Sequence, residues 1–179
     1  SYRHVIVSLG SKGPIGGELE AAGAEVHALQ LGRGAGLVEA YRRLRAIESA
    51  ASPVAIQGWM AHANIAASLL RITSGKWTPL VWGVRQSVDF TGERMRTRLL
   101  IYASVLLARL PDAIVYNSET GAAQHEAIGY PRSKRHVIPN GFDLEEYRPS
   151  PTARSGCCNR PAASWSWTTA IRSPSAPMP

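Results

Sequence analysis

Residues 111–143 read PDAIVYNSETGAAQHEAIGYPRSKRHVIPNGFD, and this stretch decides the predicted fold. Two short β-branched runs, Ala113–Tyr116 and His136–Ile138, have the length and composition of buried strands. Between them, Ser118 is placed to cap a helix that stops at Gly129. A strand, a helix and a second strand in this order predict a right-handed crossover between parallel strands.

The same alternation of strands and helices runs back to the start of the chain. Four more strand-sized runs precede this unit: His4–Leu9, Glu25–Leu31, Val54–Gln57 and Leu80–Val84. Amphipathic helices lie between several of them, and each should turn its apolar stripe toward the core. The expected stripes of three of these helices are Leu37, Tyr41, Leu44 and Ile47 in the first, Ile65, Leu69 and Ile72 in the second, and Met95, Leu99, Leu106 and Leu110 in the third. The pattern predicts a Rossmann-like α/β domain over residues 1–149, with a parallel sheet covered by helices on both faces.

Composition and charge exclude several classes of protein. A chain of 179 residues that is 45% apolar and 18% charged is long enough for one globular core. The net charge of +7 comes mostly from scattered arginines, so no nucleic-acid partner is expected. The only cysteines, Cys157 and Cys158, are adjacent, which gives neither a disulfide framework nor the spacing of a metal site. With no secretion signal after Ser1, a cytoplasmic protein is expected.

Residues 150–179 differ in kind from the rest of the chain. They are rich in Pro, Ser and Ala, contain both cysteines, and carry no acidic residue and no apolar periodicity. They form either a disordered tail or the product of out-of-frame translation of a GC-rich gene. We favour the out-of-frame interpretation.

The glycine-rich loop Gly32–Leu37 does not fit a nucleotide-binding fingerprint. A G-x-G-x-x-G loop requires its third glycine where Leu37 stands, and it should follow the first strand of the unit. A flexible loop is the better interpretation. The chain also contains neither a GK[ST] phosphate loop nor a G-x-S-x-G elbow.

Polar side chains follow the third, fourth and fifth predicted strands, where parallel sheets bind ligands. The candidate substrate-binding residues are His62, Asn64, Arg85, Asn117, Ser118 and Glu119. An arginine placed directly after a buried strand is costly without an anionic partner, so Arg85 contacts either a ligand or an internal carboxylate such as Asp89. His62 is either a structural hydrogen-bonding group or a ligand contact.

Four motifs occur in a specific order: W-x-x-H-A-N, V-W-G-V-R, D-x-I-V-Y-N-S-E and V-I-P-N-G-F-D. This order resembles the N-terminal domain of the family 4 glycosyltransferases, retaining enzymes of the GT-B fold, from about Tyr2 to Pro149. In that family the first of two Rossmann-like domains binds the acceptor and the second binds the nucleoside diphosphate sugar. The resemblance makes the segment Pro139, Asn140, Gly141, Phe142 and Asp143 the interdomain hinge.

The resemblance implies transfer of a glycosyl group from a nucleoside diphosphate sugar to an acceptor hydroxyl, with retained configuration and no other cofactor. The chain departs from the family at both ends. The family's first strand has no counterpart, since Ser1–Leu9 matches the second, and the donor domain with its paired glutamates is missing. Val84 and Arg85 stand where many relatives carry a strand-end histidine. We therefore assign no catalytic residue and expect the chain to be inactive alone.

The expected partners are a sugar or lipid-linked sugar acceptor and the missing C-terminal donor domain. Peripheral contact with the inner face of a membrane is left open. The alternative is a non-catalytic module that binds an acceptor or a protein partner.

Overall fold

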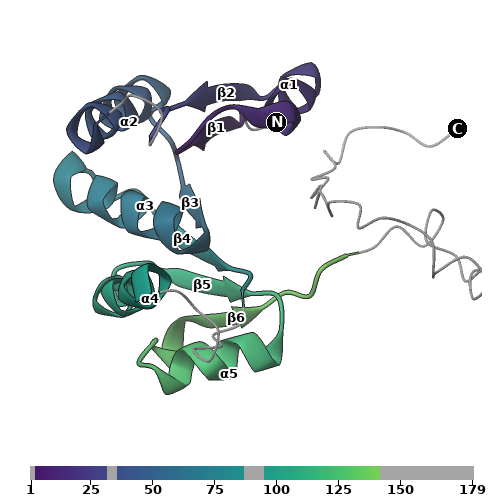
Figure 1. Cartoon of the computed structure of the whole chain (residues 1–179), viewed down its shortest axis with the longest axis vertical. Coiled ribbons are helices and arrows are strands. Elements are labelled where there is room, and N and C mark those ends of the chain that lie inside the picture. The colour runs from purple at the N-terminus through teal and green to yellow at the C-terminus, as the bar shows by residue number, and fades with distance from the viewer. Residues whose placement is uncertain (1–2, 32–35, 87–94, 142–179) are drawn as a thin grey trace, which may run out of the picture. The chain divides into compact units, whose positions relative to one another are not determined.

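A computed structural model of the chain describes residues 3–31, 36–86 and 95–141, apart from the side chains of residues 96 and 97. Residues Arg3–Asn140 form one compact unit, shown in Figure 1. Its elements are β1 (Val5–Ser8), α1 (Gly13–Ala21), β2 (Glu25–Ala28), α2 (Leu37–Ala51), β3 (Ile56–Trp59), α3 (Met60–Ser74), β4 (Leu80–Val84), α4 (Met95–Leu107), β5 (Ala113–Tyr116), α5 (Glu119–Ala127), the 3-10 turn η1 (Arg132–Lys134) and β6 (Arg135–Val137). The predicted tail, 150–179, lies outside the described residues.

The predicted α/β class is confirmed. All strand pairs in the described part of the chain are parallel. A helix lies between each strand and the next, and α5 with the turn η1 connects β5 to β6. Each of the six predicted runs overlaps a strand: the bounds of β4 and β5 are as predicted, whereas β3 begins and ends two residues later than predicted and β6 one residue earlier. Strands β3, β4, β5 and β6 form one sheet in that order, whereas β1 and β2 pair only with each other. The predicted parallel sheet is therefore interrupted between β1 and β3.

Helix ends follow the local sequence signals. The hydroxyl oxygen of Ser118 accepts a hydrogen bond from the backbone N–H of Gly121 at 3.0 Å, which confirms the predicted cap of α5. Gly129, just beyond α5, has a φ of 115°, and Gly75 ends α3 with a φ of 68°. Both conformations favour glycine because a side chain would be strained there.

The predicted inward faces of three helices are wrong in part. Met95, Leu99 and Leu106 of α4 are 67%, 63% and 82% exposed, while Ser104 is fully buried. Its hydroxyl contacts the hydroxyl of Tyr130 at 2.7 Å, so a small polar residue with a partner takes the inner face. Three further residues predicted to be inward are also exposed: Leu37, Leu69 and Ile72.

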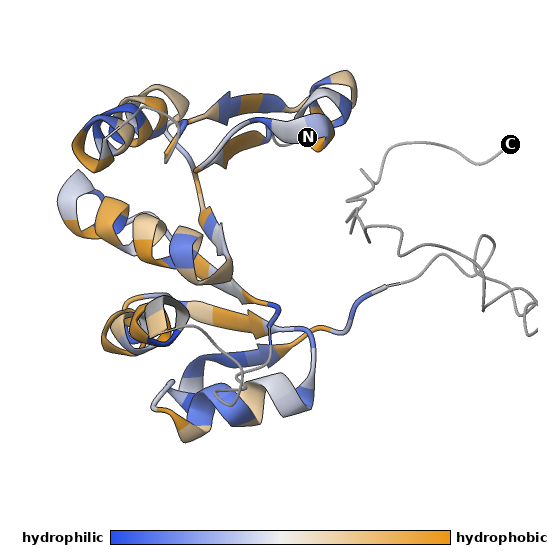
Figure 2. Cartoon of the chain, in the orientation of Figure 1, coloured by the Kyte–Doolittle hydropathy of each residue, from blue (hydrophilic) through white to orange (hydrophobic). Residues whose placement is uncertain are grey.

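The core lies around β4 and β5, and β5 is apolar along its length in Figure 2. Trp82 of β4 is fully buried, and its indole N–H donates to the hydroxyl oxygen of Ser68 at 3.1 Å. The Ser68 hydroxyl in turn donates to the carbonyl of Asn64 at 2.9 Å. Hydrogen bonds from Trp82 to Ser68 and from Ser68 to Asn64 thus let a polar stripe of α3 pack against the core.

An ion pair between a buried arginine and a half-exposed carboxylate joins α3 to the start of β5. The Arg71 side chain is 3% exposed and donates to both carboxylate oxygens of Asp112, at 2.6 and 3.3 Å. Asp112 also accepts from the backbone N–H of Leu80 at 2.8 Å, and the Arg71 guanidinium lies 3.8 Å from the ring centroid of Trp77. One carboxylate therefore neutralises a buried charge and fixes the start of β4.

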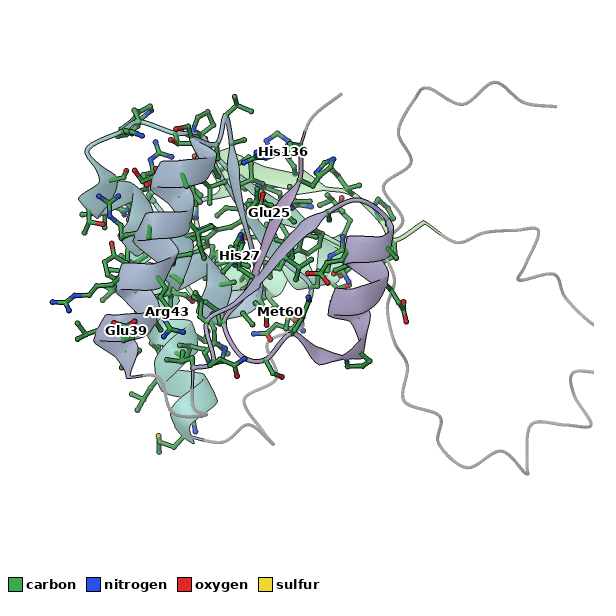
Figure 3. All side chains as sticks on the ribbon, turned by 90° about the horizontal axis from the view of Figure 1, so that it is seen from above. Glu25, His27, Glu39, Arg43, Met60 and His136 are labelled. Atoms are coloured by element: carbon green, nitrogen blue, oxygen red, sulfur yellow. The ribbon has the colours of Figure 1, made fainter. Side chains whose placement is uncertain are left out.

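We predict that Asp112→Asn destabilises the fold by about 2–3 kcal/mol, because it leaves the Arg71 charge buried without an anion. This loss is smaller than for a fully buried ion pair, because the Asp112 carboxylate is half-exposed to water. Urea denaturation followed by circular dichroism measures the loss. The control is Glu39→Gln, which breaks the exposed pair with Arg43 on α2 (Figure 3) and should cost about 0.5 kcal/mol or less. Equal effects of the two changes would contradict the role given to Asp112.

The same ion pair predicts a dependence of stability on pH. The hydrogen bond from Arg71 lowers the pKa of Asp112 below its ordinary value of 3.8, so the unfolded chain takes up this proton at a higher pH than the folded chain. The stabilisation is therefore fully present above about pH 4 and is lost as the pH falls through the folded pKa. Between pH 5 and pH 3 the melting temperature of Asp112→Asn should fall less than that of the parent.

Candidate functional site

The candidate site lies at the carboxyl ends of β3 to β6. Because these strands are parallel, the residues that follow each of them meet at one edge of the sheet. The four segments are residues 60–64 after β3, 85–86 after β4, 117–119 after β5 and 138–140 after β6. All six predicted substrate-binding residues belong to the first three segments, and the predicted hinge residues Pro139 and Asn140 belong to the fourth.

Helix α3 begins directly after β3 with no intervening loop. Met60, labelled in Figure 3, makes this turn with a φ of 69°, a conformation that few residues other than glycine adopt. His62 lies in the first turn of α3 and is exposed. This abrupt junction places His62 within three residues of the end of β3.

Asn64, in contrast, is 1% exposed and lies within the protein. Its side-chain amide donates to the carbonyl of Gly83 at 3.3 Å, and its side-chain oxygen has no partner among the described residues. A Cβ atom on Gly58 would come within 2.5 Å of that oxygen and 2.8 Å of the Asn64 Cα. Asn64 therefore holds α3 close to β3 and β4, and its predicted contact with substrate stays a prediction.

Arg85 is half-buried at the end of β4 and bridges two segments of the edge. Its guanidinium donates to the side-chain oxygen of Asn140 at 2.5 Å and lies 4.6 Å from the ring centroid of Trp59. No carboxylate of the described residues pairs with it, and Asp89, the internal partner that we considered, lies outside them. The cation is thus held by a neutral amide and an aromatic face, which leaves its charge uncompensated within the described part of the chain.

Two of the three predicted residues after β5 contact other groups of the protein. The Ser118 oxygen caps α5, and the exposed carboxylate of Glu119 pairs with Arg135. Asn117 is half-buried beside them. Pro139 and Gly141 of the predicted hinge are exposed, whereas Phe142 and Asp143 lie outside the described residues.

A small cavity of about 10 Å³ lies at the carboxyl ends of β3 and β4. Among its lining residues are Met60, Asn64, Arg85, His125 and Tyr130. A space of this size holds at most one water molecule, so it is no complete pocket for a sugar. His125 and Tyr130 were not predicted from the sequence, because they come from α5 and the turn after it and carry no motif.

Burial lowers the pKa of His125, which therefore stays neutral at physiological pH. Its Nδ1 lies 2.8 Å from the carbonyl oxygen of Gly121, so Nδ1–H donates and Nε2 is left as an acceptor. Burial also raises the pKa of Tyr116, whose hydroxyl has no partner among the described residues.

The described helices include none that is long and apolar enough to cross a membrane.

Comparison with known proteins identifies relatives of this domain. Residues 1–141 match the family model of the glycosyl transferase 4-like domain. Two crystal structures of Anabaena HepE are similar in fold: the complex with UDP and glucose at a TM-score of 0.66 and 18% identity, and the complex with UDP-glucose at 0.63 and 19%. Each comparison covers 83% of this chain and 39% of HepE. No curated protein sequence matches the chain.

We predict that Gly58→Ala destabilises the fold by about 2–3 kcal/mol, because the added Cβ would overlap Asn64 and force α3 away from β3. The control is Gly17→Ala in α1, where a Cβ meets nothing within 4 Å and where alanine should add about 0.5–1 kcal/mol. Thermal denaturation of both variants measures the difference. If Gly58→Ala were as stable as the parent, the close approach of Asn64 would be refuted.

Proposed function

The chain belongs to the glycosyl transferase 4-like family, and we propose that it forms the acceptor-side domain of an enzyme that transfers a sugar from a nucleoside diphosphate sugar to an acceptor hydroxyl with retention of configuration. The observation that carries the proposal is the polar edge at the carboxyl ends of β3 to β6, where Arg85 is held over Trp59 and bonded to Asn140. The binding of UDP-glucose by Anabaena HepE, which shares the fold, supports it.

The exposed edge suits a domain that works opposite a second one. The cavity at the ends of β3 and β4 is too small for a sugar, so the edge supplies one wall of a binding site. The chain spans only 39% of the length of HepE, which leaves room in such an enzyme for a second domain. In the proposed enzyme that second domain binds the donor and stabilises the leaving diphosphate, commonly the largest contribution to catalysis.

We assign roles to individual residues on the same basis. Arg85 contacts an anionic group of the bound substrates, because its charge has no carboxylate partner in the described residues. His62, exposed at the start of α3, contacts the acceptor. Asn140 and the residues after it connect the two domains. The acceptor is a sugar or a lipid-linked sugar, and in the latter case the cytoplasmic enzyme contacts the inner face of a membrane.

We predict that the 179-residue chain binds glycosides weakly at this edge and transfers no sugar. Nuclear magnetic resonance titration with a panel of simple glycosides should shift the signals of residues at the strand ends, including His62 and Arg85, and leave those of α1 unchanged. Incubation with nucleoside diphosphate sugars should release no nucleoside diphosphate above background. Turnover that survives removal of residues 151–179 would contradict the proposal. Glycoside binding without turnover even when a donor domain is joined would instead favour a non-catalytic module.

Arg85→Ala should weaken binding of an anionic substrate to the two-domain enzyme by about 1.5–3 kcal/mol, the range for a hydrogen bond to a charged group. Isothermal titration of the donor and of the acceptor measures the loss. Arg43→Ala, which removes an exposed arginine from α2, is the matched control and should change neither affinity. Unchanged affinities together with a lower melting temperature of Arg85→Ala would make Arg85 a structural residue.

A further inference from the structure

The outward side of α4 carries a stripe of large apolar side chains. Met95, Leu99, Tyr102 and Leu106 recur at intervals of four, three and four residues, a spacing that places them along one side of a helix. All four are exposed, from 50% for Tyr102 to 82% for Leu106. Ser104, on the opposite side, is fully buried in the core. Helix α4 therefore presents apolar groups to its surroundings as well as to the core.

Helix α3 adds to this apolar surface on the side that faces α4. Both helices cover the same face of the sheet, because β3, β4 and β5 are neighbours in that order and crossovers between parallel strands are right-handed (Figure 1). Leu70 lines the cavity that α3 shares with α2 and β1. Ile72 lies about 200° around the helix from Leu70, toward α4, and is 55% exposed. Leu69, between them on the outer side, is exposed as well.

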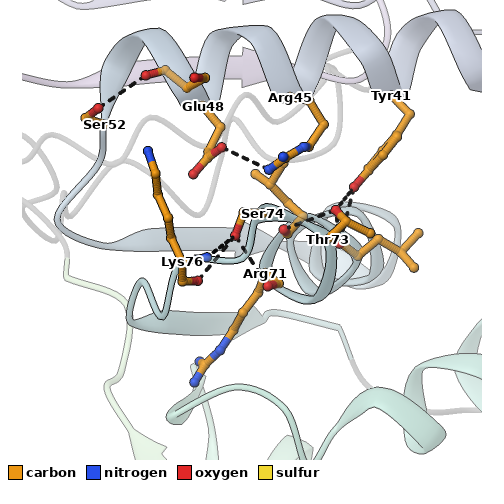
Figure 4. Close-up of polar contacts among 11 residues, drawn as sticks. Tyr41, Arg45, Glu48, Ser52, Arg71, Thr73, Ser74 and Lys76 are labelled. Carbon is orange, nitrogen blue, oxygen red and sulfur yellow. Dashed lines mark hydrogen bonds and ion pairs between the residues drawn. The ribbon is translucent and has the colours of Figure 1, made fainter.

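Trp77 extends the apolar surface at the end of α3. It follows a turn in which the Ser74 hydroxyl accepts a hydrogen bond from the backbone N–H of Lys76 at 3.3 Å (Figure 4). The Trp77 side chain is 82% exposed, and its ring lies against the Arg71 guanidinium. Because Arg71 also pairs with Asp112, Trp77 is held at the end of the domain where α4 leads into β5.

The stripe of α4 together with Leu69, Ile72 and Trp77 forms what we call the outer apolar face. The segments that carry it, residues 60–78 and 95–111, contain five Lys and Arg residues and no Asp or Glu. Each of the other described helices, α1, α2 and α5, carries two glutamates. Exposed apolar side chains and the absence of acidic residues therefore coincide on the same two helices.

This charge distribution decides between two occupants of the outer apolar face. A second copy of the chain would bring the same basic segments together, and like charges oppose such a contact. A bilayer with anionic headgroups attracts Lys and Arg, and Trp and Tyr side chains prefer the boundary between its headgroups and its hydrocarbon. Asp112 neutralises Arg71, but Lys76 and Arg109 are exposed at the Trp77 end of the face.

We propose that the outer apolar face docks this domain on a lipid bilayer that carries anionic headgroups. Leu99, Leu106 and Ile72 enter the boundary between headgroups and hydrocarbon, while Lys76 and Arg109 contact the lipid phosphates. The bilayer then lies beside α3, so a lipid-linked acceptor can reach the candidate site without leaving the membrane. That consequence rests on the proposed function, whereas docking requires no sugar and can be measured without one.

The first test measures binding of the purified 179-residue chain to vesicles by flotation. One set of vesicles is phosphatidylcholine alone, and the other contains about 30% phosphatidylglycerol, which gives an anionic surface. The chain should bind the anionic vesicles about tenfold more strongly or better at low salt, and high salt should weaken this binding because it screens the attraction.

Paired serine variants separate docking from general attraction of a chain with a net charge of +7 to an anionic surface. Leu99→Ser combined with Leu106→Ser removes two apolar groups from the outer apolar face and should weaken binding about tenfold or more. The matched control is Leu37→Ser combined with Val38→Ser, which removes two exposed apolar groups from α2 and should leave binding unchanged. The net charge is the same in all three proteins.

Charge variants and fluorescence quenching locate the bound surface. Lys76→Gln combined with Arg109→Gln should weaken binding more than Arg42→Gln combined with Arg43→Gln, although each pair removes two exposed charges. Vesicles with brominated acyl chains should quench the tryptophan fluorescence of the parent chain. Trp77→Phe should remove most of that quenching, because Trp77 is the exposed indole on the face.

Failure of the folded chain to bind anionic vesicles, or equal loss of binding in the two serine pairs, would overturn the proposal. So would quenching that persists in Trp77→Phe, or a dimer in analytical ultracentrifugation that the Leu99 and Leu106 substitutions dissociate. Circular dichroism checks that each variant folds. If the Leu99 and Leu106 pair does not fold, the quenching of the parent chain and of Trp77→Phe still decides the outcome.

Discussion

The close approach of α3 to β3 and β4 is the constraint on which the rest of this domain depends. The helix starts one residue after the strand, so its position is set by what lies beneath its first two turns. Gly58 leaves room for Asn64, whose side-chain amide donates to the carbonyl of Gly83, and Ser68 connects the helix to the indole of Trp82. Because these contacts are short and buried, the start of α3 cannot move without disturbing the core. The same contacts place the residues of the candidate site at the edge of the sheet.

Two arginines in this domain carry the same charge but lie in different environments. Arg71 is buried, and a carboxylate compensates its charge through two hydrogen bonds. Arg85 is half-buried, and its described partners are the amide of Asn140 and the ring of Trp59. A fully buried guanidinium requires an anion, whereas a partly exposed one is also stabilised by water, so Arg85 can keep its charge available. This difference in burial separates a structural arginine from a candidate ligand contact.

Two features of the described domain border α3, the carboxyl edge of the four-stranded sheet and the interruption between β1 and β3. The carboxyl edge of the four-stranded sheet provides polar groups around a space too small for a sugar. The interruption between β1 and β3 provides two unpaired strand edges around an apolar space. Both lie beside α3, the first at its N-terminus and the second along its inner side.

The sequence by itself determined the element types, the parallel α/β class and the strand ends at which polar residues gather, because periodicity, caps and glycines act over a few neighbouring residues. Ser118 and the bounds of β4 were predicted on that basis. Only the tertiary structure decided which face of α4 is buried, since Ser104 is turned inward by Tyr130 from a distant part of the chain. It also decided that Arg85 meets Asn140 and that His125 lines the same cavity. Contacts between residues far apart in sequence depend on how the strands are ordered, and no local pattern carries that information.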